Sequence, residues 1–207
     1  MDAPRLSVAF TVKRTMTMKS RIGLACFVMF FAHNVIRGFS LQGAVNKDGA
    51  ATFSLADVKY FHRYTTADQH EYTPIGQEDL NAWTDMVTIH LYRKAKDGQA
   101  LAATANAVLE NYKANKALVV KTDSIPMTQD KPAEHLIVVI FGRPEFIEVA
   151  FARFRMHDGL GTAVIYSHRI YGKKVGDQMS AWLEKNGPAL ERNLMKWDAM
   201  PKSLLPK

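Results

Sequence analysis

The sequence predicts an α+β protein built on an antiparallel sheet, and three observations lead to this class. Residues 135–171 contain three strand-like runs, HLIVVIFG, EFIEVAFARFRMH and TAVIYSHRIYG, which are rich in β-branched and aromatic side chains. Turn residues separate the runs at Gly142–Pro144 and Asp158–Gly161. Apolar residues at helical spacing lie before and after this meander. We therefore expect an α/β/α sandwich: a C-terminal three-strand meander, one helix between strands and a C-terminal helix pair.

The hydrophobic pattern of the meander predicts how its strands pair. If the first turn lies at Arg143–Pro144, Ile140 faces Ile147 and apolar side chains meet at each step. Residues 136–140 are apolar on both sides, as expected for a strand that is covered on both faces. Pro144 cannot adopt the positive φ of a tight hairpin turn, so a longer loop with a register shifted by two is the alternative, and it preserves the faces.

Extending the pairing across Asp158–Gly161 predicts the candidate contact surface of the protein. Arg153 then faces Tyr166, with Arg155 on the same face and His168 beyond. Arginine and tyrosine are frequent in interfaces, and a guanidinium can bind a carboxylate through two parallel hydrogen bonds. The alternative is that the long side chains lie over the sheet end beneath a helix, with apolar stems down and charged heads in water.

Strands are also expected earlier in the chain. Residues 57–65 alternate in polarity, residues 70–74 form a possible hairpin partner, and residues 84–94 form a second clear strand. Trp83 precedes that strand and is expected to close the end of the sheet as part of the core. Stacking on a ligand is the alternative role for Trp83.

A helix is expected over residues 99–113, with Asp97 as its N-cap and apolar residues on one face. A strand over residues 117–129, interrupted by Pro126, follows it. These two elements lead into the meander.

The C-terminal part predicts two helices. The first begins near Val175 and ends at Asn186–Gly187, where glycine suits a left-handed cap. Pro188 starts the second, which carries Leu190 and Leu194 on one side.

The charge of the chain is concentrated at its N-terminus. Residues 1–40 account for five of the seven formal positive charges, so the remainder is nearly neutral and lacks the basic surface of a nucleic-acid-binding protein. Lys19 and Arg21 precede an apolar run over residues 22–36 that small residues follow, which is the order of a secretory signal peptide. The alternative is a membrane anchor at residues 22–36, although this run is shorter than the roughly 20 residues that span a bilayer.

We therefore divide the chain into an N-terminal extension plus signal peptide (1–40), a linker or first irregular strand (41–56), a single α/β domain (57–200) and a tail (201–207). The expected location is the periplasm or the exterior of the cell, with membrane contact only through the leader. Cys26, the one cysteine, lies within the leader, so we expect a mature domain without disulfides.

The passage EYTPIGQEDLNAWTDMVTIHL, with the helix, strand and meander that follow it, resembles small exported bacterial proteins whose arrangement is similar to the PsbP and Mog1 α/β/α sandwich. The resemblance spans roughly residues 55–190. It implies a non-enzymatic binding or assembly role, and no functional residue of those families is carried over to this chain.

The sequence contains no glycine-rich phosphate loop, HExxH or GxSxG motif. Ser167 and His168 are adjacent on a strand and must point to opposite faces, so they cannot form a nucleophile and its base. His62 and His70 can meet across a hairpin, but without a carboxylate or cysteine they make a poor zinc site. We expect no cofactor and no metal.

Two functions remain open from the sequence. The first is an exported, non-enzymatic binding or accessory protein of a bacterial envelope that acts through protein–protein contacts, with an inhibitor or immunity-like role within this class. The second is a periplasmic hydrolase whose site is assembled from distant residues such as His62 and His168. A pocket with convergent His, Ser and acid groups favours the enzyme, and an exposed apolar or arginine–tyrosine patch favours the binding protein.

Overall fold

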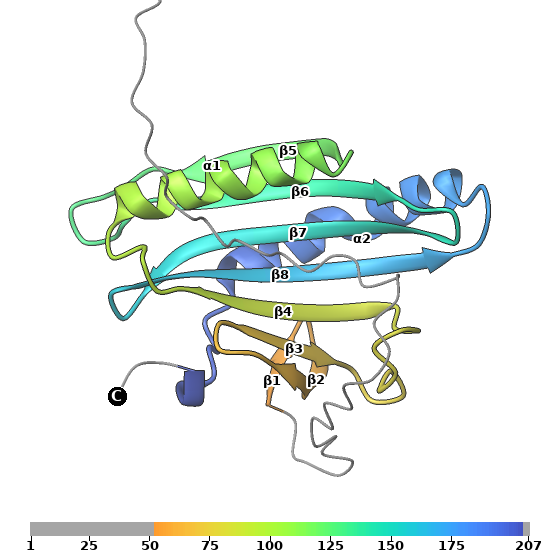
Figure 1. Ribbon diagram of the computed structural model, residues 1–207, viewed down its shortest axis with the longest axis horizontal. Helices are drawn as coiled ribbons and strands as arrows, with labels where there is room; N and C mark the ends of the chain where they lie inside the picture. The colour runs from red at the N-terminus through yellow and green to blue at the C-terminus, as the bar shows by residue number, and fades with distance from the viewer. Residues whose placement is uncertain (1–51, 205–207) are drawn as a thin grey trace, which may run out of the picture. The chain divides into compact units, whose positions relative to one another are not determined.

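The computed structural model describes residues 52–204. An eight-stranded antiparallel sheet with the order β1-β2-β3-β4-β8-β7-β6-β5 forms its centre (Figure 1). The strands are β1 Phe53–Leu55, β2 Val58–Thr65, β3 Gln69–Thr73, β4 Asp85–Tyr92, β5 Leu118–Ile125, β6 Glu134–Gly142, β7 Phe146–His157 and β8 Leu160–Tyr171, and the helices are α1 Gly98–Ala114, α2 Gly176–Lys196 and the 3-10 helix η1 Lys202–Leu204. The predicted α+β class is confirmed.

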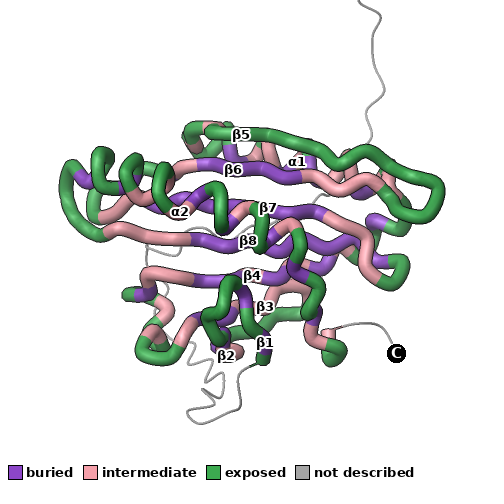
Figure 2. The backbone as a smooth tube through the Cα atoms, turned by 180° about the vertical axis from the view of Figure 1, so that it is seen from behind, coloured by how far each residue is buried: buried purple, intermediate pink, exposed green. Residues whose placement is uncertain are grey.

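The two long helices cover opposite faces of the sheet. Helix α1 lies in front of the sheet in Figure 1 and packs on β6 and β7, and α2 lies in front of the sheet in the reverse view of Figure 2 and packs on β7 and β8. Side chains of β6 alternate between the two helices: Leu136 and Val138 join the core beneath α2, whereas Phe141 meets Tyr112 of α1 with ring centroids 5.4 Å apart. The prediction that β6 is buried on both faces is therefore confirmed.

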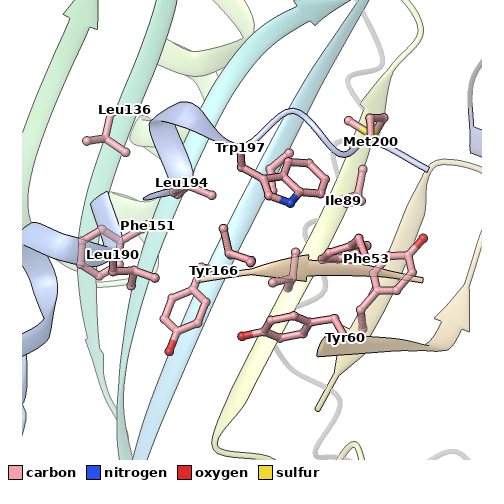
Figure 3. Close-up of a cluster of buried hydrophobic side chains, with 14 of the residues drawn as sticks. Phe53, Tyr60, Ile89, Leu136, Phe151, Tyr166, Leu190, Leu194, Trp197 and Met200 are labelled. Carbon is pink, nitrogen blue, oxygen red and sulfur yellow. The ribbon is translucent and has the colours of Figure 1, made fainter. Parts of the chain in front are cut away.

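The larger core lies between α2 and the sheet and extends to β1 (Figure 3). Trp197, just after α2, meets Phe53 of β1 with ring centroids 5.1 Å apart, and its indole nitrogen donates to the carbonyl of Ser54 at 2.9 Å. Phe53 and Leu55 of β1 are buried, and this short strand lies within residues 41–56, the range expected to be a linker or a first irregular strand. Residues 1–51, which include the predicted signal peptide and most of the range 41–56, lie outside the described residues.

Both hairpins of the meander are shifted by two residues from the first predicted register. Ile140 pairs with Val149 rather than Ile147, and Arg153 pairs with Val164 rather than Tyr166. The alternative register for the first hairpin is thus the observed one, and in both hairpins every side chain keeps its face.

The turns explain the shift. At the first hairpin the amide of Arg143 donates to the carbonyl of Phe146 at 2.9 Å, so Pro144 and Glu145 are the central residues, and proline suits the first central position. At the second hairpin Asp158 and Gly159 have φ of 48° and 73°, the two positive values that a type I′ turn requires.

The predicted C-terminal helix pair is a single helix, α2, with Pro188 inside it. Gly187 does not have a positive φ and therefore does not end the helix. Met179, Leu190 and Leu194 are buried along one side of the helix, on both sides of the proline. Their burial in the sheet core offsets the cost of a proline in a helix interior, which is about 3 kcal/mol.

None of the helices in the described part of the chain is long and apolar enough to cross a membrane.

Candidate functional site

Arg153, a predicted contact residue, is buried beneath the C-terminal end of α2. Its side chain donates to the carbonyls of Leu194 at 2.9 Å and Trp197 at 2.6 Å, and it forms an ion pair with Glu134 at 2.7 Å. Only 4% of Arg153 is exposed. The last carbonyls of a helix lack partners within the helix, and a cation there also interacts favourably with the helix dipole. Arg153 thus anchors α2 and does not present a surface to a partner.

Arg155 lies beside it and serves the same helix end. Its Nη1 donates to the carbonyl of Trp197 at 3.3 Å and to Asp198 Oδ1 at 2.6 Å. The structure therefore favours the alternative to the predicted contact surface: Arg153 is buried under the end of α2, and Arg155 lies partly exposed against Trp197 and Asp198 just after it.

Tyr166 and His168, the other predicted residues of that surface, meet at a carboxylate. Asp85 Oδ1 accepts from the Tyr166 hydroxyl at 2.5 Å and contacts His168 Nδ1 at 2.9 Å. Asp85 Oδ2 accepts from Thr84 at 3.1 Å and Gln77 at 3.3 Å. Because β4 pairs with β8 and places Asp85 directly opposite His168, the sheet register fixes this cluster.

The hydrogen bonds set the charge of the cluster. Burial opposes the ionisation of Asp85, but the hydrogen bonds from His168 and Tyr166 outweigh it and lower the pKa of this carboxyl below 3.8. Burial and the nearby Asp85 charge raise the pKa of the Tyr166 phenol, which stays protonated. The carboxylate is therefore ionised at neutral pH, with a phenol donor on one side and an imidazole on the other.

The imidazole of His168 stacks on the indole of Trp182 with ring centroids 4.0 Å apart and planes 7° apart. This stack joins β8 to α2. Ser167 pairs with Met86 and lies on the opposite face from His168, as the sequence predicted. Among the described residues no hydroxyl or thiol is hydrogen-bonded to His168, so Asp85 and His168 form an oriented acid–imidazole pair without a nucleophile.

Trp83 closes the end of the sheet, and 2% of it is exposed. The guanidinium of Arg169 lies 3.8 Å from its ring centroid and 4.3 Å from that of Phe146. Arg169 also donates to the buried Glu148 at 2.8 Å. These contacts leave Trp83 in the core, with its ring taken by an arginine rather than open to a ligand.

His62 and His70 approach each other across the β2–β3 hairpin, with ring centroids 6.2 Å apart. Burial lowers the pKa of both imidazoles, and the neighbouring His62 and Arg93 lower that of His70 further. The described residues contain no group of three or more His, Cys, Asp or Glu side chains that could hold a metal ion.

A groove of about 520 Å³ lies between α2 and the edge strand β5. Apolar side chains make its floor and helix wall, and charged side chains lie at its rim. It is lined by Val120, Lys121, Val138, Phe151, Leu183, Glu184, Gly187, Pro188, Glu191 and Arg192. Gly187 leaves space in the wall of the groove because it has no side chain. A Cβ added at this position would meet only Leu183 and Phe151, at 3.7 and 3.8 Å.

The groove continues onto an exposed apolar edge. Leu118 is 65% exposed and Val120 49%, and Met127, just beyond β5, is 74% exposed. Val120 also lines the groove, so exposed apolar surface of the edge strand adjoins it, and exposed apolar surface is frequent at interaction sites. This surface, which we call the α2–β5 groove, is the best candidate for binding in the described residues.

Sequence reasoning missed Asp85 and the groove. Asp85 lies on the same strand face as Val87 and Ile89. An acidic residue on the apolar face of a predicted strand is unusual, and this signal could have identified Asp85 as a site residue. The groove depends on Gly187 and Pro188 remaining inside α2, which the sequence did not predict.

A protein-family model matches residues 35–198, a range that includes all eight strands and both long helices. The chain belongs to that family. No curated protein matches the sequence.

Solved structures with a similar fold include two of Mog1. The Ran-binding protein Mog1p of Saccharomyces cerevisiae has 10% identity and a TM-score of 0.41, with 71% of this chain and 89% of that chain covered. A point mutant of Mog1 has 12% identity and a TM-score of 0.44, with 70% and 88% covered. Human STARD10 has 8% identity and a TM-score of 0.28, with 67% and 74% covered. These likenesses are too distant to transfer a partner or an activity to this family member.

Proposed function

We propose that this protein is an exported, non-enzymatic binding protein of a bacterial envelope that takes a protein partner at the α2–β5 groove. The α2–β5 groove carries the proposal. Its lining residues include no histidine, serine or cysteine, whereas its floor is apolar and its edge is exposed. A site with an apolar floor and an exposed apolar edge is suited to binding apolar side chains of a partner.

The lining indicates the kind of segment that fits. Val138, Phe151 and Leu183 offer an apolar floor for one large apolar side chain. Charges of both signs flank it, because Lys121 and Arg192 lie at the rim with Glu184 and Glu191. We infer that the partner presents an apolar anchor residue with polar neighbours, the usual composition of an interface centre and its rim.

Binding is favoured over a hydrolase because the histidine best placed for catalysis lacks a nucleophile. His168 is held by Asp85 and stacked on Trp182, and Ser167 points to the other face of the sheet. An inhibitor or immunity-like role falls within the proposed binding class. Export by residues 1–40 is part of the proposal and rests on the order of charged, apolar and small residues in that segment.

Filling the groove tests the proposal. Gly187→Met places a flexible apolar side chain in the groove, and Ala103→Met adds the same side chain at an exposed site on α1, on the opposite face. Partners captured from periplasmic extract by the wild-type protein are purified and titrated against both variants. We expect Gly187→Met to weaken the Kd by about tenfold or more and Ala103→Met to leave it unchanged. Equal affinity for both variants would reject the groove as the binding site.

Export is tested separately on the full chain. We expect a tagged protein to be recovered from the periplasmic fraction with an N-terminus between residues 41 and 45, which leaves β1 intact. Retention in the cytoplasm with residues 1–40 intact would contradict the proposed location without bearing on the groove.

A further inference from the structure

The edge strand β5 lacks a strand partner on its outer side among residues 52–204, although the amide of Ser124 donates to Asp123 Oδ1 at 2.8 Å. On its inner side it pairs with β6. It is eight residues long, whereas β1 at the opposite edge has three. An exposed edge presents unpaired amides and carbonyls and therefore serves as a template for another strand.

Edge strands are often protected against pairing with another chain by a bulge or a lysine. Strand β5 has both, yet neither blocks its outer side. The bulge lies between Val119 and Lys121, near the start of the strand, and the pairing with β6 continues without interruption from Lys121 to Ile125. The ammonium of Lys121 lies on the α2 face, where it forms ion pairs with Glu191 at 2.7 Å and with Asp123 of its own strand at 3.4 Å, so it does not cover the outer backbone of β5. Val120 and Ile125 are each 49% exposed, so apolar surface remains on the strand.

The sequence of β5 is complementary to itself. In an antiparallel pair of two identical strands centred on Thr122, Lys121 of each copy faces Asp123 of the other. Both side chains lie on the α2 face, because their β6 partners Val138 and Leu136 do. Opposite charges that face each other across strands stabilise a sheet, and like charges destabilise it.

The neighbouring registers lack this match. Centring the pair on Lys121 places two lysines opposite each other, and centring it on Asp123 places two aspartates opposite each other. A twofold axis perpendicular to the sheet keeps the α2 faces of both copies on one side, so registers that pair residues of opposite faces do not arise. Thr122 is therefore the one centre among these three that charge favours.

We propose that two copies of this chain associate through antiparallel β5–β5 pairing centred on Thr122, which joins their sheets into one. This goes beyond binding at the α2–β5 groove. Because the two strands pair within the plane of the sheet, the groove of each copy stays open on the α2 face and the two grooves lie on the same side of the dimer.

A pair of charge reversals tests the register. In Asp123→Lys homodimers lysines face lysines, and in Lys121→Asp homodimers aspartates face aspartates. An equimolar mixture of the two variants restores both opposite-charge pairs. Analytical ultracentrifugation of the full protein without its leader is expected to show a wild-type dimer, a Kd weakened by about tenfold or more in each variant alone, and a heterodimer of near wild-type affinity in the mixture.

The control is Lys173→Asp, a reversal at an exposed residue between β8 and α2, which is expected to leave the dimer intact. Circular dichroism melts of all variants check that folding is preserved. A wild-type protein that stays monomeric up to its solubility limit overturns the proposal. So does a dimer that both single variants retain, or a mixture that fails to recover the heterodimer. Binding at the groove is measured with a different variant, Gly187→Met, so the two proposals can fail independently.

Discussion

His168 of β8 lies face to face with Trp182 of α2, with ring centroids 4.0 Å apart, and Asp85 Oδ1 holds the other side of the imidazole at 2.9 Å. The stack fixes the first half of α2 on the sheet. Arg153 fixes the end of the same helix through the carbonyls of Leu194 and Trp197. The α2–β5 groove lies along the helix between these two attachments.

Trp182→Ala is expected to destabilise the protein by about 2 kcal/mol, since it removes the stack and part of the apolar surface of a half-buried aromatic side chain. Trp182→Phe is the control, because it keeps an aromatic ring over His168 and should lose less than half as much. Urea unfolding at constant m-value measures the difference. Equal losses for the two variants would show that stacking on His168 contributes nothing specific.

Asp85 makes stability depend on pH. Its folded pKa lies below 3.8, so its contribution is present above this value and is lost as the pH falls through the lowered pKa. Asp85→Asn is expected to cost about 1–3 kcal/mol at neutral pH, because hydrogen bonds to a charged acceptor are lost. The variant should also lose less stability than wild type between neutral pH and about pH 3.

The control for this measurement is Asp130→Asn, at an exposed residue of the loop before β6. It should follow the wild-type pH profile. If Asp85→Asn also follows that profile, the carboxylate is not ionised preferentially in the folded state.

The strands and their faces could be predicted from the sequence, and the register could not be fixed by the same reasoning. Side chains alternate with a period of two, so moving Ile140 from Ile147 to Val149 leaves every side chain on its face of the sheet, although Leu136 then faces Arg153 and Phe141 faces Glu148. Local turn chemistry carries the missing information. Asp158–Gly159 is a typical type I′ pair, and Pro144 suits the first central position of its turn.

The break expected in α2 is a case in which a local sequence signal was present but tertiary packing overrode it. Gly187 and Pro188 disfavour a helix interior locally, but burial of Leu190 and Leu194 beneath the same helix outweighs that preference. The site residues depend on contacts that are distant in sequence. Arg153 could be assigned to the end of α2 only by knowing that Leu194 lies above β7, a contact over 41 residues.

Arg153→Ala is expected to destabilise the protein by about 3 kcal/mol, because Glu134 loses its partner and two helix-end carbonyls lose their donor beneath α2. Arg155→Ala removes weaker and more exposed contacts and should cost about 1 kcal/mol. The affinity for the partner, measured under conditions in which Arg153→Ala is fully folded, should remain unchanged. A large loss of affinity with unchanged stability would restore the arginine as a contact residue.

Gly187→Ala is expected to stabilise the protein by about 0.5–1 kcal/mol, since alanine is favoured over glycine in a helix interior. The added Cβ meets Leu183 and Phe151 at ordinary contact distances of 3.7 and 3.8 Å. Thermal unfolding should therefore show a higher Tm. A lower Tm would mean that α2 is strained at this position and that the groove wall is less rigid than its burial indicates.

Gly161→Ala tests how closely β8 approaches the loop before α1. A Cβ at residue 161 would lie 2.5 Å from Ala95 Cβ and 3.3 Å from Leu101 Cδ1, and the amide of Gly161 already donates to the Ala95 carbonyl at 2.8 Å. The backbone must move to accept the methyl group, so we expect a loss of about 1–3 kcal/mol. Gly142→Ala is the matched control, because a Cβ there meets nothing within 4 Å. Similar stability of the two variants would mean that the loop yields to β8, and that α1 is not held against the sheet by this contact.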